Sequence, residues 1–228
     1  MTNSIIDIYG SDQIHTDYLR FTLAMEKELL NDYKPALASL EKRYGEESEK
    51  AKVLGSLLGV SKDYLLNLVA TNDTFFVSRW WETCDQMPVS VRDKFIVDQI
   101  THLRFFFFLK MVAMVETQLR IITRAIDPGN PGTKEFYKIY SELLAKLNLQ
   151  AQYNQAYDIA RLIRNTIHNM GVHTSASVSV QFNGQTYQFT QWKQIDFLSD
   201  RLNLDLQDEL IKSVVDITGT KAFQSSTL

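Results

Sequence analysis

The stretch from Asp93 to Ile126 reads DKFIVDQITHLRFFFFLKMVAMVETQLRIITRAI. Its apolar residues recur at spacings of three and four, and they cover more than one side of a helix. They include Phe95, Ile96, Ile100, Leu103, Phe107, Met111, Met114, Val115, Leu119 and Ile122. We therefore predict one long central helix that packs on several sides, within a mainly α fold.

Helical patterns also lie on both sides of this central helix. We predict helices over residues 16–44, with a bend near Pro35, and over residues 46–58, 62–70, 133–147, 150–170 and 204–217. Ser61, Ser90 and Thr133 are suited to cap helix starts, and the Pro- and Gly-rich segment 127–132 ends the central helix. We expect residues 1–92 to form an N-terminal helical region on the same core, residues 93–218 a helical domain, and residues 219–228 a flexible tail.

The pattern changes to strict alternation between residues 177 and 189. Two short alternating runs flank Asn183-Gly184, a pair that accepts both positive φ angles of a type I′ turn. Pairing around that turn places Val180 opposite Tyr187 and Val178 opposite Phe189. We therefore predict a β-hairpin inserted before the last helix.

The composition is that of an ordinary soluble globular protein, with 228 residues, 45% apolar residues and 22% charged residues. A net charge of -3 argues against a protein that coats nucleic acid through bulk electrostatics. The single cysteine, Cys84, cannot form an intramolecular disulfide. The N-terminus lacks a signal-peptide pattern, and the run Phe105–Phe108 is bracketed by Arg104 and Lys110, so we expect no membrane span and a cytoplasmic location.

Four polar residues recur along the helix predicted over residues 150–170. Arg161, Arg164, Asn165 and His168 share one side, because each residue turns the helix by about 100°. Arginine binds phosphate well, and histidine transfers protons near neutral pH. Such a stripe suits cleavage of a phosphodiester by a neighbouring hydroxyl, which RNA supplies as its 2′-hydroxyl.

One copy of this stripe contains only one histidine, whereas the reaction needs both an acid and a base. A symmetric homodimer that faces two such helices would supply both imidazoles and bring the arginines together in one cleft. We therefore expect a homodimer through this helix.

Arg164-Asn165 followed by His168, and Arg161 with six residues before His168, resemble the Arg-x4-6-His signature of the HEPN superfamily. The resemblance implies a small helical bundle, usually dimeric, that cleaves RNA without metal or cofactor and leaves 2′,3′-cyclic phosphate ends. Many such domains act in toxin–antitoxin and phage-defence systems, which implies an antitoxin or another protein as partner. It also implies a supporting acidic residue on an earlier helix, for which Glu116 is the candidate. Either arginine remains a candidate for the phosphate clamp.

Other interpretations of these residues stay open. Arg164, Asn165 and His168 also suit a structural hydrogen-bond network, and the whole chain also suits a catalytically inactive HEPN-like binding module. Arg120 and Arg124 would extend a basic groove for RNA or pair with nearby carboxylates. His173 would supply a second imidazole or lie in a surface loop; with His168 it makes a poor metal site, so we expect no metal. We expect Trp80 and Trp81 to pack, and we assign Cys84 no nucleophilic role.

Overall fold

The computed structural model describes residues 11–74, 89–129 and 135–228, and most of these residues are helical. The elements are α2 (Ser11–Lys27), the π-helical segment η1 (Glu28–Tyr33), α3 (Lys34–Tyr44), α4 (Glu49–Asn72), α5 (Val89–Ile126), α6 (Phe136–Lys146), α7 (Gln150–His168), β1 (Val178–Phe182), β2 (Gln185–Phe189), α8 (Asp200–Gly219) and α9 (Lys221–Gln224). The predicted mainly α fold with a hairpin before the last long helix is confirmed.

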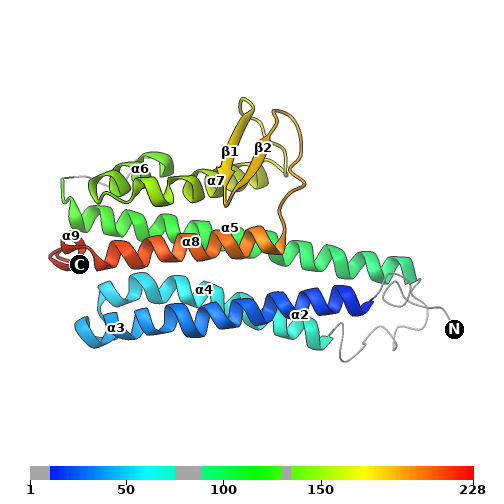
Figure 1. Cartoon of the computed structure of the whole chain (residues 1–228), viewed down its shortest axis with the longest axis horizontal. Helices are drawn as coiled ribbons and strands as arrows, with labels where there is room; N and C mark the ends of the chain where they lie inside the picture. The colour runs from blue at the N-terminus through cyan, green and yellow to red at the C-terminus, as the bar shows by residue number, and fades with distance from the viewer. Residues whose placement is uncertain (1–10, 75–88, 130–134) are drawn as a thin grey trace.

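The helices stack in three layers (Figure 1). One layer contains α2, α3 and α4, the middle layer contains α5 and α8, and the third contains α6 and α7 with the hairpin. Buried residues from all three layers belong to one hydrophobic cluster. The helices of the N-terminal region therefore pack on the same core as the rest of the chain.

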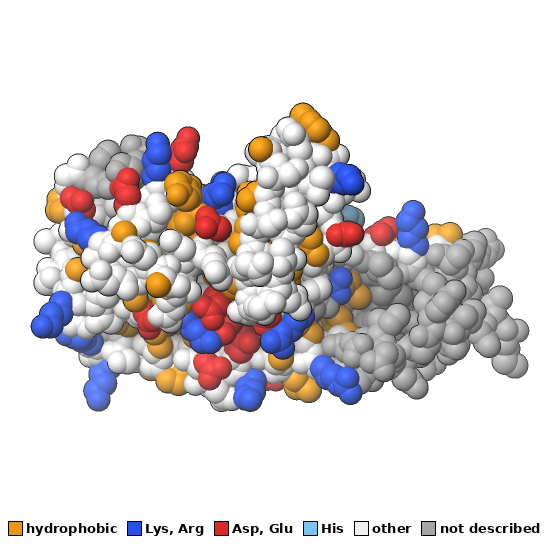
Figure 2. All heavy atoms as spheres, turned by 45° about the horizontal axis from the view of Figure 1, so that its top comes forward, with side chains coloured by type: hydrophobic (Ala, Val, Ile, Leu, Met, Phe, Trp, Pro, Cys, Tyr) orange, Lys and Arg blue, Asp and Glu red, His pale blue; other side chains and the backbone are white. Residues whose placement is uncertain are grey.

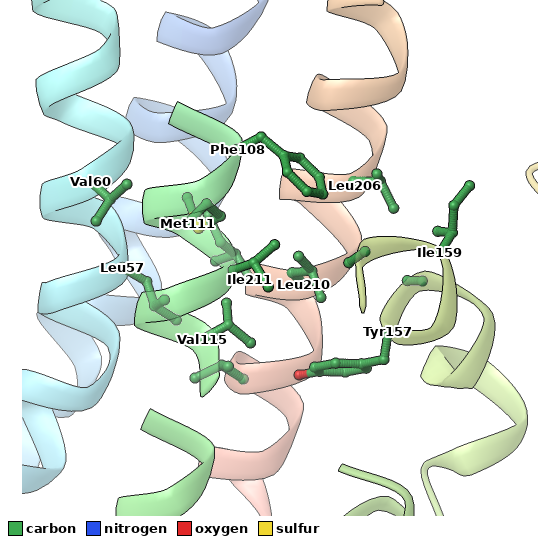
Figure 3. Packing of buried hydrophobic residues seen from close by; sticks show 14 of the residues in the cluster. Leu57, Val60, Phe108, Met111, Val115, Tyr157, Ile159, Leu206, Leu210 and Ile211 are labelled. Carbon is green, nitrogen blue, oxygen red and sulfur yellow. The ribbon is translucent and has the colours of Figure 1, made fainter. Parts of the chain in front are cut away.

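The middle layer supplies the centre of that core. Figure 3 shows Leu206, Leu210 and Ile211 of α8 lying between α5 and α7, and these side chains are almost completely buried. Burial of each such side chain stabilises the fold by roughly 1.5–3 kcal/mol. The Tyr157 hydroxyl of α7 lies 2.6 Å from Ser213 Oγ of α8, so a buried polar group between these helices is satisfied.

The central helix α5 begins at Val89, four residues before the predicted start at Asp93. Ser90 therefore lies inside the helix instead of capping it. Glu135 is the residue that precedes α6, and its side chain makes no cap bond. Ser199, for which no cap was predicted, caps α8 by accepting a hydrogen bond from the Leu202 amide. The predicted Thr133 cap lies outside the described residues.

The hairpin has the predicted register, with Val178 opposite Phe189 and Val180 opposite Tyr187. Asn183 and Gly184 have φ angles of 48° and 73°, as a type I′ turn requires. Val180, Phe182, Tyr187 and Phe189 are buried toward α7, and the alternate residues are exposed. The turn and the alternation of this segment were both predictable because each depends only on local sequence.

The helical region over residues 11–44 contains a π-helical segment shortly before Pro35. Residues Glu28–Tyr33 form the π-helical segment η1, and α3 continues from Lys34 with Pro35 in its first turn. Proline lacks the N–H that an α-helix interior needs, so the chain cannot continue as a uniform α-helix through this position. The predicted irregularity near Pro35 therefore takes the form of a π-helical turn.

A polar network joins η1 to α8. The Tyr33 hydroxyl donates to the Asp208 carboxylate, and Gln207 Nε2 lies 3.5 Å from Glu28 Oε2. Burial, followed by repulsion from Asp208, raises the pKa of Glu28 to about 7. The contact between the first and the middle layer therefore includes a carboxyl group, that of Glu28, which stays protonated to a higher pH than it would in water.

The prediction of two separate helices, over residues 46–58 and 62–70 with Ser61 as a cap, is wrong. The structure has one continuous helix, α4, which Ser48 caps by accepting a hydrogen bond from the Ala51 amide. Ser61 is fully buried, and its hydroxyl bonds to the Leu57 carbonyl and to Gln207 of α8. Gly59 costs a helix only about 1 kcal/mol relative to alanine, and burial of its neighbours against other layers outweighs this.

Among the described residues, α4 alone has the length and apolarity of a candidate membrane span, with a mean hydropathy of 1.3 over its best window. Leu54, Leu57 and Leu68 of this helix are buried against neighbouring helices. Packing against the neighbouring helices accounts for part of the apolar composition of α4.

The expected flexible tail, residues 219–228, instead packs on the protein. Thr220 caps the short helix α9, and the Phe223 side chain is fully buried. Lys50 Nζ donates to the Gln224 carbonyl at 2.9 Å, which ties the tail to α4. The buried Phe223 ring, the Thr220 cap and the Lys50 bond hold this segment, and the hydrophilic neighbours of Phe223 gave no sign of this in the sequence.

Candidate functional site: the polar stripe of α7

The four residues of the predicted stripe lie on the solvent-facing side of α7. The side chains of Arg161 and Arg164 are each 29% exposed, and Asn165 and His168 are exposed. The helix ends at His168, and Gly171 follows in the left-handed conformation with φ of 82°. His168 therefore occupies the last turn of the helix, next to the chain reversal that leads to the hairpin.

Glu116 on α5 connects the stripe to the central helix. Its Oε2 atom lies 3.4 Å from Arg164 Nη2, and its Oε1 atom lies 2.5 Å from Arg120 Nη2. The Glu116 side chain is only 15% exposed. A largely shielded carboxylate thus holds two guanidinium groups from different helices, and the candidate supporting acid and Arg164 are in contact.

Arg161 belongs to a different cluster, which lies between α6 and α7. Its Nη2 atom is 4.0 Å from Asp158 Oδ1, and its guanidinium lies 5.6 Å from the centre of the Tyr137 ring. The Tyr140 hydroxyl donates to the same Asp158 oxygen at 2.5 Å, and burial together with this bond raises the pKa of Tyr140. The two candidate arginines are therefore held by two different carboxylates.

Asn165 and His168 differ from both arginines. Their side chains have no hydrogen bond or ion pair within the described ranges, and both face solvent. The neighbouring Asn169 makes the bonds to the helix end, since its Nδ2 atom donates to the Asn165 carbonyl and to Thr174 Oγ1. Their amide and imidazole groups are consequently available to a ligand.

His173 is not part of this surface. It is only 3% exposed, its Nε2 atom lies 3.0 Å from the Ala176 carbonyl oxygen, and its ring packs 5.5 Å from Phe189. The structure matches neither expectation for His173, a second imidazole for the site or a surface-loop residue, because its imidazole is buried against the start of the hairpin. Arg124 is exposed one turn beyond Arg120 on α5.

A shallow groove of about 340 Å³ lies at the end of α7. It is lined by Phe105 of α5, Ile167 of α7, and a group of residues after the helix and after the hairpin, namely Met170, Gly171, Gln194 and Ile195. An isolated bridge between Val172 and Gln194 brings these two loops together. No local sequence pattern predicts this pairing, so the groove could not be predicted from the sequence.

Asp158 was also missed, although its spacing of three residues before Arg161 is a standard helical ion-pair spacing. Tyr137 and Tyr140 carry no such signal, because their contact with Arg161 depends on how α6 packs on α7.

Trp80, Trp81 and Cys84 lie outside the described residues. In the described part of the chain, no group of three His, Cys, Asp or Glu side chains is placed to hold a metal ion.

On the face that contains α6, α7 and the hairpin, the described residues form no uniformly basic area. Figure 2 shows the hairpin standing out from this face, with acidic and basic side chains intermixed around the base of the hairpin.

Comparison with family models, with curated proteins and with solved structures finds no match to this chain. The chemistry of this site is therefore argued from its geometry.

Proposed function

We propose that this protein is a metal-independent RNA endonuclease of the HEPN type that acts as a homodimer. The observation that carries the proposal is the state of His168 and Asn165. Both are exposed at the end of α7 without a recorded partner in the described chain, beside arginines that the fold holds in place. Polar side chains that the fold leaves without partners, next to fixed cations, are suited to bind and cleave a phosphodiester.

The proposed reaction uses the 2′-hydroxyl of RNA as the nucleophile. His168 of one copy takes the proton from this hydroxyl as its oxygen attacks phosphorus. His168 of the second copy gives a proton to the departing 5′-oxygen as the bond between phosphorus and that oxygen breaks. The products are a 2′,3′-cyclic phosphate and a 5′-hydroxyl, and no atom from a metal or cofactor enters the balance.

The remaining residues of the stripe bind and orient the phosphate. Arg164 is the better phosphate clamp, because Glu116 fixes its guanidinium one turn from His168. Asn165 would donate to a phosphate oxygen. Arg161 lies two turns from His168 and is held by Asp158, so we assign it contact with a neighbouring phosphate of the same strand.

A second candidate function is a catalytically inactive HEPN-like module that binds a protein or nucleotide. One observation favours it: each arginine of the stripe is already neutralised by a carboxylate of its own chain, Glu116 or Asp158. A phosphate must compete with these carboxylates. In this alternative the exposed His168 and Asn165 would contact a partner without chemistry.

The test is incubation of several RNAs, including tRNA, with the protein in the presence of a chelator. We expect wild type to produce fragments with 2′,3′-cyclic phosphate ends, and His168→Ala to produce none. His102→Ala is the matched control, since His102 is an exposed histidine on α5, outside the stripe. If wild type and His168→Ala leave every RNA equally intact, the nuclease proposal is wrong and the binding module is favoured.

The biological setting follows from the same proposal. Many HEPN nucleases act in toxin–antitoxin or phage-defence systems, and we propose that setting, a cytoplasmic location and an antitoxin-like protein partner here. Light scattering tests the dimer through α7. A replacement of Asn165 by a bulky charged residue should weaken such a dimer and should reduce cleavage in parallel.

A further inference from the structure

Exposed apolar side chains gather on the outer face of the first layer. Twelve large apolar residues are exposed in the described part of the chain, and five of them lie on α2, η1 and α4: Leu19, Leu23, Leu30, Leu66 and Val69. Along α2 and η1 the spacings are four and seven residues, and along α4 the spacing is three, so on each helical segment these residues share one side. We call this the leucine face. Exposed apolar residues that gather on one face often mark an interaction surface.

A groove of about 470 Å³ runs along the leucine face between the two helical walls. Leu30, Leu37 and Leu58 are among its lining residues, and Gly55 and Gly59 form part of the α4 wall. A Cβ atom at Gly59 would meet nothing within 4 Å, and one at Gly55 would meet only the Leu37 side chain. The groove is thus hollow where the glycines lie. Leu23, which precedes the lining residue Glu26 by three positions, is 61% exposed.

Charged residues at the edge of this groove are arranged in opposite signs. Glu26 precedes Leu30 by four positions, and Lys34 follows it by four, while Lys62 lines the groove from α4. No ion pair is recorded for these three side chains among residues 11–74, 89–129 and 135–228. Their charges remain available to groups outside the chain.

We propose that the leucine face is a two-fold interface between two copies of this protein. A two-fold axis at Leu30 relates position 26 of one copy to position 34 of the other, and position 23 to position 37. Glu26 then faces Lys34 of the second copy twice, with Lys62 nearby. Leu23 of each copy enters the hollow beside Leu37 and Gly55 of the other. Both the charges and the shape are self-complementary, which is the requirement for an isologous interface.

This interface is distinct from the dimer that the proposed nuclease mechanism requires. The leucine face belongs to the layer of α2, α3 and α4, whereas the polar stripe belongs to α7 in the opposite layer (Figure 1). A chain that uses both surfaces assembles beyond a dimer. The Asn165 substitution is aimed at the α7 contact and Leu30→Glu at the leucine face, so different variants distinguish failure of one proposal from failure of the other.

The test is sedimentation velocity of the full chain over the micromolar range, with circular dichroism to verify folding of each variant. Leu30→Glu places two like charges at the axis, so we expect the association constant to fall by about a hundredfold or more. Leu23→Glu should act in the same direction. Trp192→Glu is the matched control for this interface, because Trp192 is 71% exposed near the hairpin, away from the leucine face, and it should leave association through the leucine face unchanged.

A charge exchange distinguishes this interface from general loss of apolar surface. Glu26→Lys or Lys34→Glu alone should weaken association by roughly threefold to tenfold, and the double variant should restore it, because two pairs are reversed together. A wild type that stays monomeric overturns the proposal. So does association that Leu30→Glu and Leu23→Glu leave unchanged, and so does a double variant that is weaker than both single variants.

Discussion

The substitution Glu28→Gln removes an ionisable group from the contact between η1 and α8. Burial and the nearby Asp208 carboxylate raise the pKa of Glu28 from 4.5 to about 7 in the folded protein. In the unfolded chain the pKa returns to its usual range. Between about pH 4.5 and about pH 7, the folded state binds more protons here than the unfolded state. The stabilisation from neutral Glu28 is therefore present at low pH and is lost as the pH rises through that window.

The size of the effect follows from the same contact. A pKa difference of this size corresponds to about 3 kcal/mol at a site fully shielded from solvent. Glu28 is only partly buried, so solvent screening reduces the expected contribution to about 1–2 kcal/mol. Glutamine cannot ionise and keeps an oxygen that accepts from Gln207 Nε2. We expect the variant to match wild type near about pH 4.5 and to exceed it by about 1–2 kcal/mol near about pH 8.

The measurement is urea unfolding of both proteins across this pH range, followed by circular dichroism. The quantity of interest is the difference in unfolding free energy between variant and wild type, because other titrating groups cancel in that difference. Glu47→Gln, at an exposed position before α4, is the control and should show no such trend. A difference that is the same at both ends of the range, or one that favours wild type as the pH rises, refutes the reasoning.

Three further substitutions test the packing and the site. Phe223→Ala should destabilise the protein by about 3–5 kcal/mol in urea unfolding, because the ring is fully buried, and an unchanged stability would show that the tail is not part of the core. Gly184→Ala should cost about 1 kcal/mol, since its φ of 73° strains alanine while nothing lies within 4 Å of the added Cβ; a stabilised variant would contradict the type I′ turn. Glu116→Gln should lower the free energy of unfolding by about 1–2 kcal/mol, because Arg164 and Arg120 lose the carboxylate that they share. Asp63→Asn, which removes an exposed ion pair, should lower it by less than about 1 kcal/mol. Equal effects of the two substitutions would argue against a structural role for Glu116.

Local patterns predicted the elements whose formation depends on nearby residues. The hairpin is the clearest case, because Asn183-Gly184 sets the turn and the alternation on either side sets the register. The polar stripe on α7 was predictable for the same reason, since only helical spacing decides which residues share a side. The other side of α7 is apolar and buried in the core, so the polar stripe faces solvent.

Contacts between distant segments decided what could not be predicted. Ser61 suits a helix start by type, yet it lies inside α4, where the Leu57 carbonyl and Gln207 satisfy its hydroxyl. His173 suits a surface loop by its neighbours, yet Phe189 from β2 covers its ring. The separate carboxylate partners of Arg161 and Arg164 likewise depend on how α6 and α5 pack on α7.

The position of α8 in the middle layer determines when the protein can complete its fold during synthesis. Tyr33 of η1 bonds to Asp208 of α8 across a separation of 175 residues, and Phe223 fills the end of the same core. Before α8 has been synthesised, α4 and α7 can pack on α5 and on the helices of their own layers, but half of the central layer is missing. The nascent chain must therefore keep the apolar sides of these helices soluble until α8 has emerged from the ribosome. For this protein, the core closes only when α8 packs between the outer layers.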